Sequence, residues 1–194
     1  MPGTEAQYWV GQMYHVGWGV PSDQTEADKW FRKAAKGRRR LAEKHDAKAQ
    51  VNLAYMYAMG YGVPLDYGEA AKWYRSAAEQ GDAEGQHGLA NAYRIGLGVP
   101  EDHAMMVYWE REAAFQDHYV AQANLAYFYE HGKGVRKDMV RALMWTILVA
   151  RQMPWVAGMG YSFAERRDEL ISKMTPAEIA EAQRLAREWK PKTE

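Results

Sequence analysis

The residue types that could carry chemistry are present in this chain, but they are scattered. Six histidines occur along 194 residues, and none forms a recognised metal-ligand spacing with another histidine or a carboxylate. There is no cysteine, which excludes disulfides, thiolate metal sites and a cysteine nucleophile. No serine lies in a G-x-S-x-G turn, and no carboxylate pair stands out as an acid and a base. We therefore predict no catalytic residue, no metal site and no cofactor, and a protein that is not an enzyme.

Four Gly-x-Gly turns are the clearest local motif. They follow stretches with helical periodicity, not strands, and all lack the third glycine of the nucleotide-binding sequence G-x-G-x-x-G. A glycine with positive φ can end a helix, and a second one lets the chain turn again. We interpret the pairs as turns between helices: Gly17 and Gly19, Gly60 and Gly62, Gly96 and Gly98, Gly132 and Gly134.

The turns recur at a nearly constant interval, which indicates structural repeats. The last three copies are 36 residues apart and the first gap is 43, measured on the tyrosines Tyr14, Tyr57, Tyr93 and Tyr129. A period of this length suits a helix–turn–helix unit. The seven additional residues lie around Arg38-Arg39-Arg40. Seven residues are about two helical turns, so we expect a longer helix that keeps its phase; the alternative is a basic docking finger.

Each repeat contains two predicted helices with different signatures. The first helix carries a small and apolar face, as in Ala49, Leu53 and Ala54. The second helix follows an N-cap aspartate, at Asp23, Asp66, Asp102 and Asp138. Glu26 and Glu69, three residues after their aspartates, favour capping boxes in the first two repeats. A tryptophan recurs on the apolar stripe of the second helix and is predicted to be core, at Trp30, Trp73, Trp109 and Trp145.

The pattern changes after the fourth repeat. Pro154 is expected to stop the last repeat helix, and Gly158 and Gly160 mark a loop. A helix is predicted from about residue 161 to residue 173. The stretch 175–178, Thr-Pro-Ala-Glu, is a strong start for another helix. Because a solenoid needs a terminal cap with one polar side, we assign residues 155–194 to capping helices.

The whole pattern, A-x-x-x-L-[GA]-x-x-Y-x-x-G-x-G-V-x-x-D-x-x-x-A-x-x-W-[YF]-x-x-A-A, resembles the Sel1-like repeat, a relative of the tetratricopeptide repeat. The second copy matches essentially throughout, and the third and fourth deviate in their second helices. The resemblance implies an all-α fold, a right-handed α-solenoid of antiparallel helix pairs. We assign residues 1–154 to four such repeats, at about 5–46, 47–82, 83–118 and 119–153.

The resemblance also implies a function, because such repeats usually serve as adaptors for other macromolecules. In the related tetratricopeptide architecture the first helices line a concave groove. Carried onto this sequence, the partner-binding residues are Tyr8, Gln12, His15, Val51, Tyr55, His87, Asn91, Arg94, Tyr127, Glu130 and His131, together with Met59 and Ala123. We predict a scaffold that binds a peptide or protein partner there. The alternative is a protein that binds fragments of the bacterial cell envelope, of the peptidoglycan type.

Charge and hydropathy limit the other partners. Lysine plus arginine equals aspartate plus glutamate at 25 each, so no basic surplus favours nucleic acid. No apolar run approaches the roughly 20 residues that span a bilayer, so we predict no membrane insertion. The exposed first repeat predicts a homodimer through that end. The compartment stays open: cytoplasm is the default, and the periplasm is the alternative if an upstream signal was removed.

Overall fold

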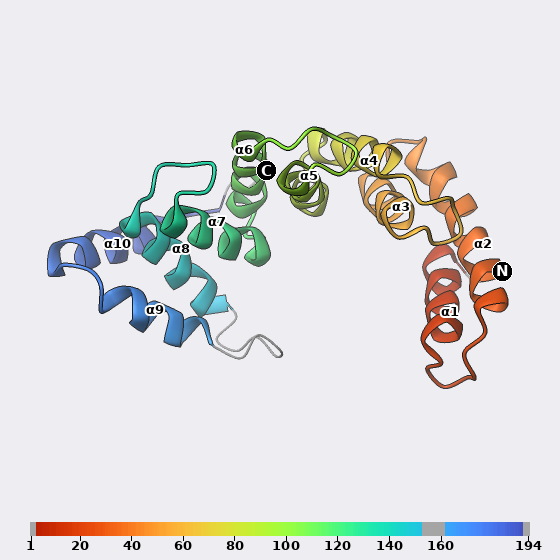
Figure 1. The fold of residues 1–194 in the computed structure, drawn as a ribbon, viewed down its shortest axis with the longest axis horizontal. Helices are drawn as coiled ribbons and strands as arrows, with labels where there is room; N and C mark the ends of the chain where they lie inside the picture. The colour runs from red at the N-terminus through yellow and green to blue at the C-terminus, as the bar shows by residue number, and fades with distance from the viewer. Residues whose placement is uncertain (1–2, 153–161, 192–194) are drawn as a thin grey trace. The chain divides into compact units, whose positions relative to one another are not determined.

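The computed structural model describes residues 3–152 and 162–191, and within them the fold is all-α, as the sequence predicts (Figure 1). The expectations for Pro154, Gly158 and Gly160 fall outside the described residues. The chain divides into two compact units, Met1–Glu101 and Asp102–Glu194, and each is described by itself. None of the described helices combines the length and apolar character needed to cross a membrane.

The first unit contains five helices among its described residues: α1 (Thr4–Val16), α2 (Gln24–Ala42), α3 (Ala47–Met59), α4 (Tyr67–Glu79) and α5 (Ala83–Ile95). The second unit contains α6 (His103–Phe115), α7 (Tyr119–His131), α8 (Met139–Gln152), α9 (Phe163–Ile171) and α10 (Pro176–Glu188). Odd-numbered helices up to α7 are the first helices of the repeats, and α2, α4, α6 and α8 are the second helices.

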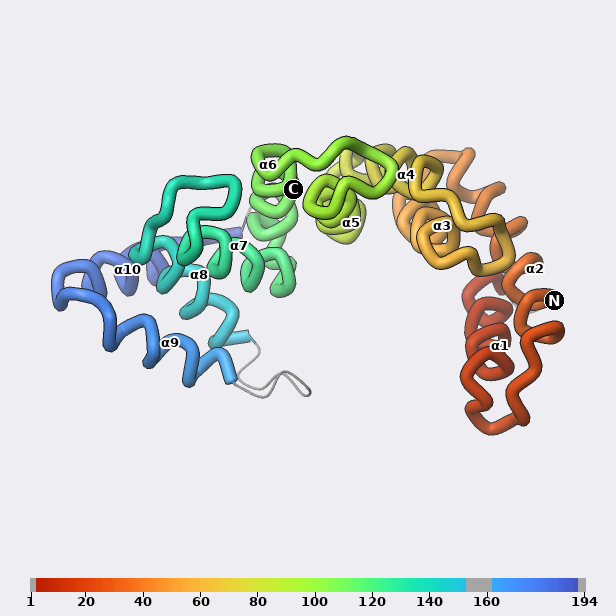
Figure 2. The backbone as a smooth tube through the Cα atoms, viewed as in Figure 1, coloured from red at the N-terminus to blue at the C-terminus, as the bar shows by residue number. Residues whose placement is uncertain are grey.

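The predicted turn chemistry is confirmed at both glycines of every turn. The first glycine ends the first helix with φ between 68° and 81°, and the second also has positive φ, between 67° and 76°. Figure 2 shows the chain folding back after α1, α3 and α7 at these points. The four predicted aspartates then cap the second helices by accepting backbone N–H bonds, as in Glu69 N–H to Asp66 Oδ1 at 2.9 Å.

The capping boxes predicted in the first two repeats do not form. Glu26 and Glu69 instead bind the ammonium groups of Lys29 and Lys72, each at 2.6 Å. A lysine three residues further along the same helix face competes for the carboxylate, and this exposed ion pair replaces the bond to the backbone.

Consecutive repeats are held together by contacts that recur in register. The second glycine of a turn lies directly on the backbone of the preceding second helix, and a Cβ at Gly62 would overlap the main chain of Phe31 and Arg32. Gly98 lies in the same way on Tyr67, and Gly134 on His103. Only glycine combines this close approach with a positive φ.

Two polar contacts accompany each glycine contact. A buried glutamine of the first helix donates to a carbonyl near the end of the preceding second helix: Gln50 to Ala42, Gln86 to Ala78 and Gln122 to Ala114. An arginine of the preceding second helix donates to the column tyrosine: Arg39 to Tyr57, Arg75 to Tyr93 and Arg111 to Tyr129. These bonds satisfy polar groups that burial would otherwise leave unpaired.

The seven-residue insertion lengthens α2, as expected from its phase. This helix has 19 residues, whereas α4 and α6 have 13. The insertion adds about two helical turns, so the helix keeps its phase. Arg39 therefore still donates to the Tyr57 hydroxyl, and the Ala42 carbonyl still accepts from Gln50. The docking-finger alternative is wrong for Arg38, whose side chain is buried with its guanidinium over the Tyr8 ring at 4.4 Å.

The C-terminal helices α9 and α10 both pack against α8. Thr175 and Glu178 form a capping box at the start of α10, with Pro176 as its first residue. Leu170 of α9 and Ala182 of α10 are buried in one cluster with Leu143 of α8. Of the four predicted core tryptophans, Trp145 is buried, and the other three are partly buried.

The glycine contacts give a matched pair of substitutions. Gly19 and Gly62 have φ of 72° and 69°, but Gly19 meets only the Met13 side chain, at 3.8 Å. Gly19→Ala should therefore cost only the left-handed backbone penalty of about 1–2 kcal/mol. Gly62→Ala adds a clash with α2 and should cost at least about 1 kcal/mol more. Urea denaturation followed by circular dichroism compares the two, and equal losses would show that the close approach contributes nothing.

Candidate functional site

The first unit brings five of the predicted partner-binding residues into one groove, among them Met59. Val51 and Tyr55 on α3 face His87 and Asn91 on α5 across a shared hollow. Tyr74 of α4 also lines the hollow and contributes to both of its parts. We call this feature, lined by α3, α4 and α5, the α3–α5 groove.

The groove has two compartments of different character that share Tyr55, Tyr74, Gly88 and Asn91. The apolar compartment has a volume of about 330 Å³ and is completed by Ala58, Met59, Tyr67, Ala70, Ala71, Ala92, Ile95 and Leu97. The polar compartment has a volume of about 580 Å³ and is completed by Lys48, Val51, Asn52, Asp82, Glu84 and His87. Met59 and Ile95 are about half exposed, at 50% and 47%.

Gly88 makes room for the residue that joins the two compartments. It stands in the middle of α5, and a Cβ there would overlap the Tyr74 ring. The equivalent pair in the second unit is Glu110 and Asn124, whose side chains are hydrogen bonded at 2.7 Å. The same position between consecutive repeats therefore holds an aromatic ring over glycine in one unit and a buried polar pair in the other.

Two donors in the groove are available to a ligand. Burial raises the pKa of Tyr74 to about 12, with Tyr55 and Glu84 adding to the rise, so its phenol keeps its proton at neutral pH. Its hydroxyl has no hydrogen-bond partner among the described residues. Asn91 accepts a bond from Arg94 Nε at 2.9 Å through Oδ1, which leaves its Nδ2 hydrogens without a described partner. Arg94 thus orients Asn91 and does not itself line the groove.

The three predicted residues of the first repeat pack internally. Gln12 donates to the Tyr8 hydroxyl at 2.8 Å, and the His15 ring nitrogen lies 3.0 Å from Gln24 Oε1. Tyr8 and His15 surround Tyr61, at ring distances of 6.5 and 5.5 Å, and Tyr61 stacks on Phe31. These side chains therefore pack at the interface between the first and second repeats.

The predicted residues Tyr127, Glu130 and His131 of the second unit make contacts with their own neighbours in the described part of the chain. Tyr127 and His131 pack ring against ring at 4.2 Å on the outside of α7. Glu130 is mostly buried and binds the guanidinium of Arg166, which attaches α9 to α7. Its role is thus structural, a contact that spans 36 residues of sequence and that a repeat pattern does not reveal.

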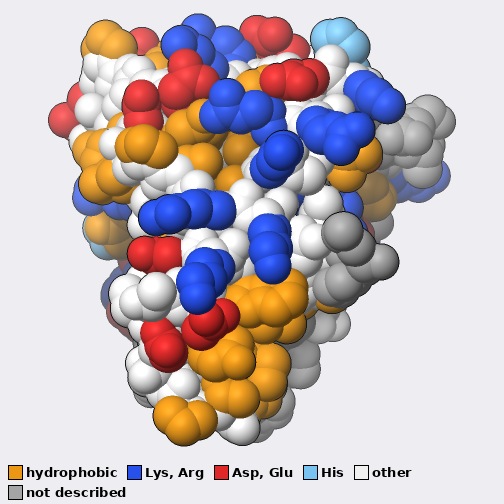
Figure 3. Space-filling model, turned by 90° about the vertical axis from the view of Figure 1, so that its right-hand side faces the viewer, with side chains coloured by type: hydrophobic (Ala, Val, Ile, Leu, Met, Phe, Trp, Pro, Cys, Tyr) orange, Lys and Arg blue, Asp and Glu red, His pale blue; other side chains and the backbone are white. Residues whose placement is uncertain are grey.

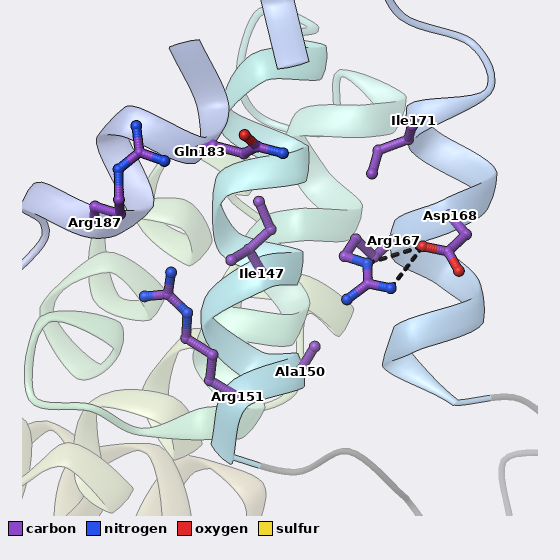
Figure 4. Close-up of a pocket in the computed structure, with 8 residues that line it drawn as sticks. All are labelled: Ile147, Ala150, Arg151, Arg167, Asp168, Ile171, Gln183 and Arg187. Atoms are coloured by element: carbon purple, nitrogen blue, oxygen red, sulfur yellow. Dashed lines mark hydrogen bonds and ion pairs between the residues drawn. The ribbon is translucent and has the colours of Figure 1, made fainter. Parts of the chain in front are cut away.

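A separate basic cavity of about 470 Å³ lies among α8, α9 and α10 (Figure 4). Arg151, Arg167 and Arg187 line it together with Ile147 and Ile171. Arg151 donates to the Ala186 carbonyl at 3.0 Å, and Arg167 binds Asp168 at 2.8 Å. Two of the three guanidinium groups are therefore already engaged within the capping helices.

In residues 3–152 and 162–191, no group of three histidine, aspartate or glutamate side chains could hold a metal ion. His118 instead caps α7, where its Nδ1 accepts the Ala121 N–H at 3.2 Å.

The sequence did not single out Tyr74, Ile95 or Leu97 as groove residues. One signal was available. Gly88 stands in a helix interior, at a position where the other repeats carry Trp9, Asn52 and Asn124. A glycine inside a helix costs stability and marks a close approach by a neighbour.

Comparison with known proteins agrees with this architecture. A family model described as the Sel1 repeat matches residues 4–37, 47–82, 83–116 and 120–152. The chain belongs to the Sel1 repeat family. Sel1-repeat proteins generally mediate protein–protein interactions, and their fold is typically non-catalytic.

Two solved structures of Sel1-repeat type resemble the chain. One is a protective antigen of uropathogenic Escherichia coli strains with an SLR fold, at a TM-score of 0.70 and 30% identity, covering 96% of this chain and 37% of that one. The other is a Sel1 repeat protein from Oxalobacter formigenes, at a TM-score of 0.54 and 35% identity, covering 77% and 58%. This chain thus spans less than two thirds of either protein. A comparison with curated proteins gives no match.

The fit of Tyr74 over Gly88 is tested by a double-mutant cycle. Gly88→Ala should destabilise the chain by about 1–3 kcal/mol because the new methyl group overlaps the ring. In a Tyr74→Ala background the same change should be neutral or stabilising by up to about 1 kcal/mol, since alanine is the better helix former. Urea denaturation gives the free energy of unfolding of the wild type, the two single variants and the double variant. Additive effects would show that the two residues do not pack on one another.

Proposed function

We propose that this chain is a non-catalytic interaction module that binds an extended peptide segment of a partner protein in the α3–α5 groove. The observation that carries the proposal is the placement of two free donors, Tyr74 Oη and Asn91 Nδ2, between an apolar and a polar compartment. A peptide offers backbone carbonyls at regular intervals and side chains of both kinds, which matches this arrangement.

The apolar compartment sets one requirement on the peptide. Its walls are alanines, Met59, Ile95 and Leu97, and its floor includes Ala70 and Ala71 of α4. A volume of about 330 Å³ accommodates one large apolar side chain. Burying such a side chain stabilises a complex by about 1.5–3 kcal/mol before ordering costs.

The polar compartment accepts the rest of the segment. Lys48 stands at the start of α3, and Asp82 and Glu84 at the start of α5, so the compartment presents charges of both signs. Asp82 also caps α5 by accepting the Gly85 N–H at 2.8 Å, which fixes its position. Charged and polar side chains of the partner can pair with these groups.

The test is selection of peptides from a random display library against the full chain, followed by affinity measurement. Selected peptides should carry a large apolar residue beside polar ones. Their affinity should fall about tenfold or more on Tyr55→Ala/Asn91→Ala, since truncated anchors cost at least about 1.4 kcal/mol. Tyr55 is 39% exposed, so its truncation leaves the fold intact.

Tyr108→Ala is the matched control, because Tyr108 is an exposed tyrosine on α6, outside the groove. It should bind the selected peptides as the wild type does. Failure to enrich any peptide, or equal affinity for the double variant, would contradict the proposal. Purified muropeptides are a second probe; if they bind in the groove and peptides do not, the cell-envelope alternative replaces it.

A further inference from the structure

The interface between consecutive repeats has a receiving side that recurs in the same form. It consists of a first helix and the Gly-x-Gly turn after it. In the second repeat, Ala49 and Met56 of α3 are buried against α2, and Tyr61 stacks on Phe31 at 4.6 Å. In the fourth repeat, Ala121 and Phe128 of α7 are buried in the same positions.

The first repeat carries this receiving side with nothing on it among the described residues. Ala6 and Met13 of α1 correspond to Ala49 and Met56, yet Ala6 is exposed and Met13 is only partly buried. Trp18 corresponds to Tyr61 and is 73% exposed. Trp9 lies on the same side and is 55% exposed, so four side chains and the turn form one uncovered surface.

Figure 3 shows this side of the molecule, where α1 and α2 lie. Hydrophobic side chains gather at the end of the face where α1 reaches its turn, and lysine and arginine side chains lie beyond them. A contiguous apolar surface of this kind marks an interaction site on a folded protein.

We propose that α1 and the Gly17–Gly19 turn receive a second-type helix from another Sel1-repeat unit. The continuity of the interface identifies this occupant, because every other receiving side described in the chain is filled by such a helix. The Tyr14 hydroxyl supports the same occupant. Its counterparts Tyr57, Tyr93 and Tyr129 accept a bond from an arginine of the preceding helix, and Tyr14 has no partner among the described residues.

Trp9 sets the specificity of this surface. It stands at the position of Gly88 and Asn124, which face Tyr74 and Glu110 of the preceding helix. A large indole fills the space that Gly88 leaves to the Tyr74 ring and that Asn124 leaves to the Glu110 side chain, so it favours a small residue on the arriving helix. The arriving helix therefore carries a small residue opposite Trp9. The next residue along that helix is an arginine, which donates to the Tyr14 hydroxyl.

A second copy of this chain does not supply such a helix from its described residues. The second helices α2, α4 and α6 pack on α3, α5 and α7, and α8 is covered by α9 and α10. The homodimer predicted from the sequence would have to join two receiving sides, which are alike and lack the arginine. Another repeat unit is the better complement.

The probe is a peptide with the sequence of residues 102–116, cross-linked between positions 104 and 108, which α6 exposes to solvent. One version carries Glu110→Ala, which places a small residue opposite Trp9, and the other keeps Glu110. The alanine version should bind the full chain about tenfold more tightly, because the carboxylate would be buried without its Asn124 partner. Hydrogen exchange should slow in Thr4–Gly19 only.

Trp18→Ala should weaken the alanine peptide about tenfold, as expected for an aromatic anchor. Its side chain is exposed, so the fold is unaffected, and Tyr127→Ala serves as the matched control with unchanged binding. The proposal is overturned if the two peptides bind equally, if protection appears elsewhere, or if Trp18→Ala changes nothing. It is equally overturned if the unliganded chain is a dimer in which Trp18 is already protected.

Discussion

The direct contact between the second glycine of each turn and the backbone of the preceding helix is the constraint on which the repeats depend. A side chain at Gly62 would overlap α2, and one at Gly134 would overlap α6. The contact sets the distance between consecutive helix pairs within each unit. The arginine–tyrosine and glutamine–carbonyl bonds then fix the rotation, because both have partners only in one register.

This register explains why the chain tolerates an insertion in α2. Two added turns bring Arg39 and Ala42 to the positions that Arg75 and Ala78 hold in α4, so the second repeat meets an unchanged partner. The same contacts do not involve the position that Tyr74 holds in α4 and Glu110 holds in α6, so the residue there can differ between repeats. Tyr74 over Gly88 opens a groove there, whereas the hydrogen-bonded pair of Glu110 and Asn124 fills the same place.

The sequence predicts what is local and periodic. Glycine pairs, N-cap aspartates and the Thr175 capping box each act within a few residues, and the structure has all of them. The sequence does not predict contacts between distant residues, such as the ion pair of Glu130 and Arg166. It also predicts the wrong partner where a neighbour competes, as Lys29 does for the Glu26 carboxylate. The binding residues and the boundaries of the repeats and cap stay predictions. A periodicity places a side chain on a face, but only the adjoining helices decide whether that face is hollow.

The central claim is that the α3–α5 groove holds a partner peptide across its two compartments. A crystal structure of the chain with a selected peptide tests it most directly. We expect one apolar side chain between Met59 and Ile95, and peptide carbonyls within hydrogen-bond distance of Tyr74 Oη and Asn91 Nδ2. A peptide bound on another surface, with the groove empty, would contradict it.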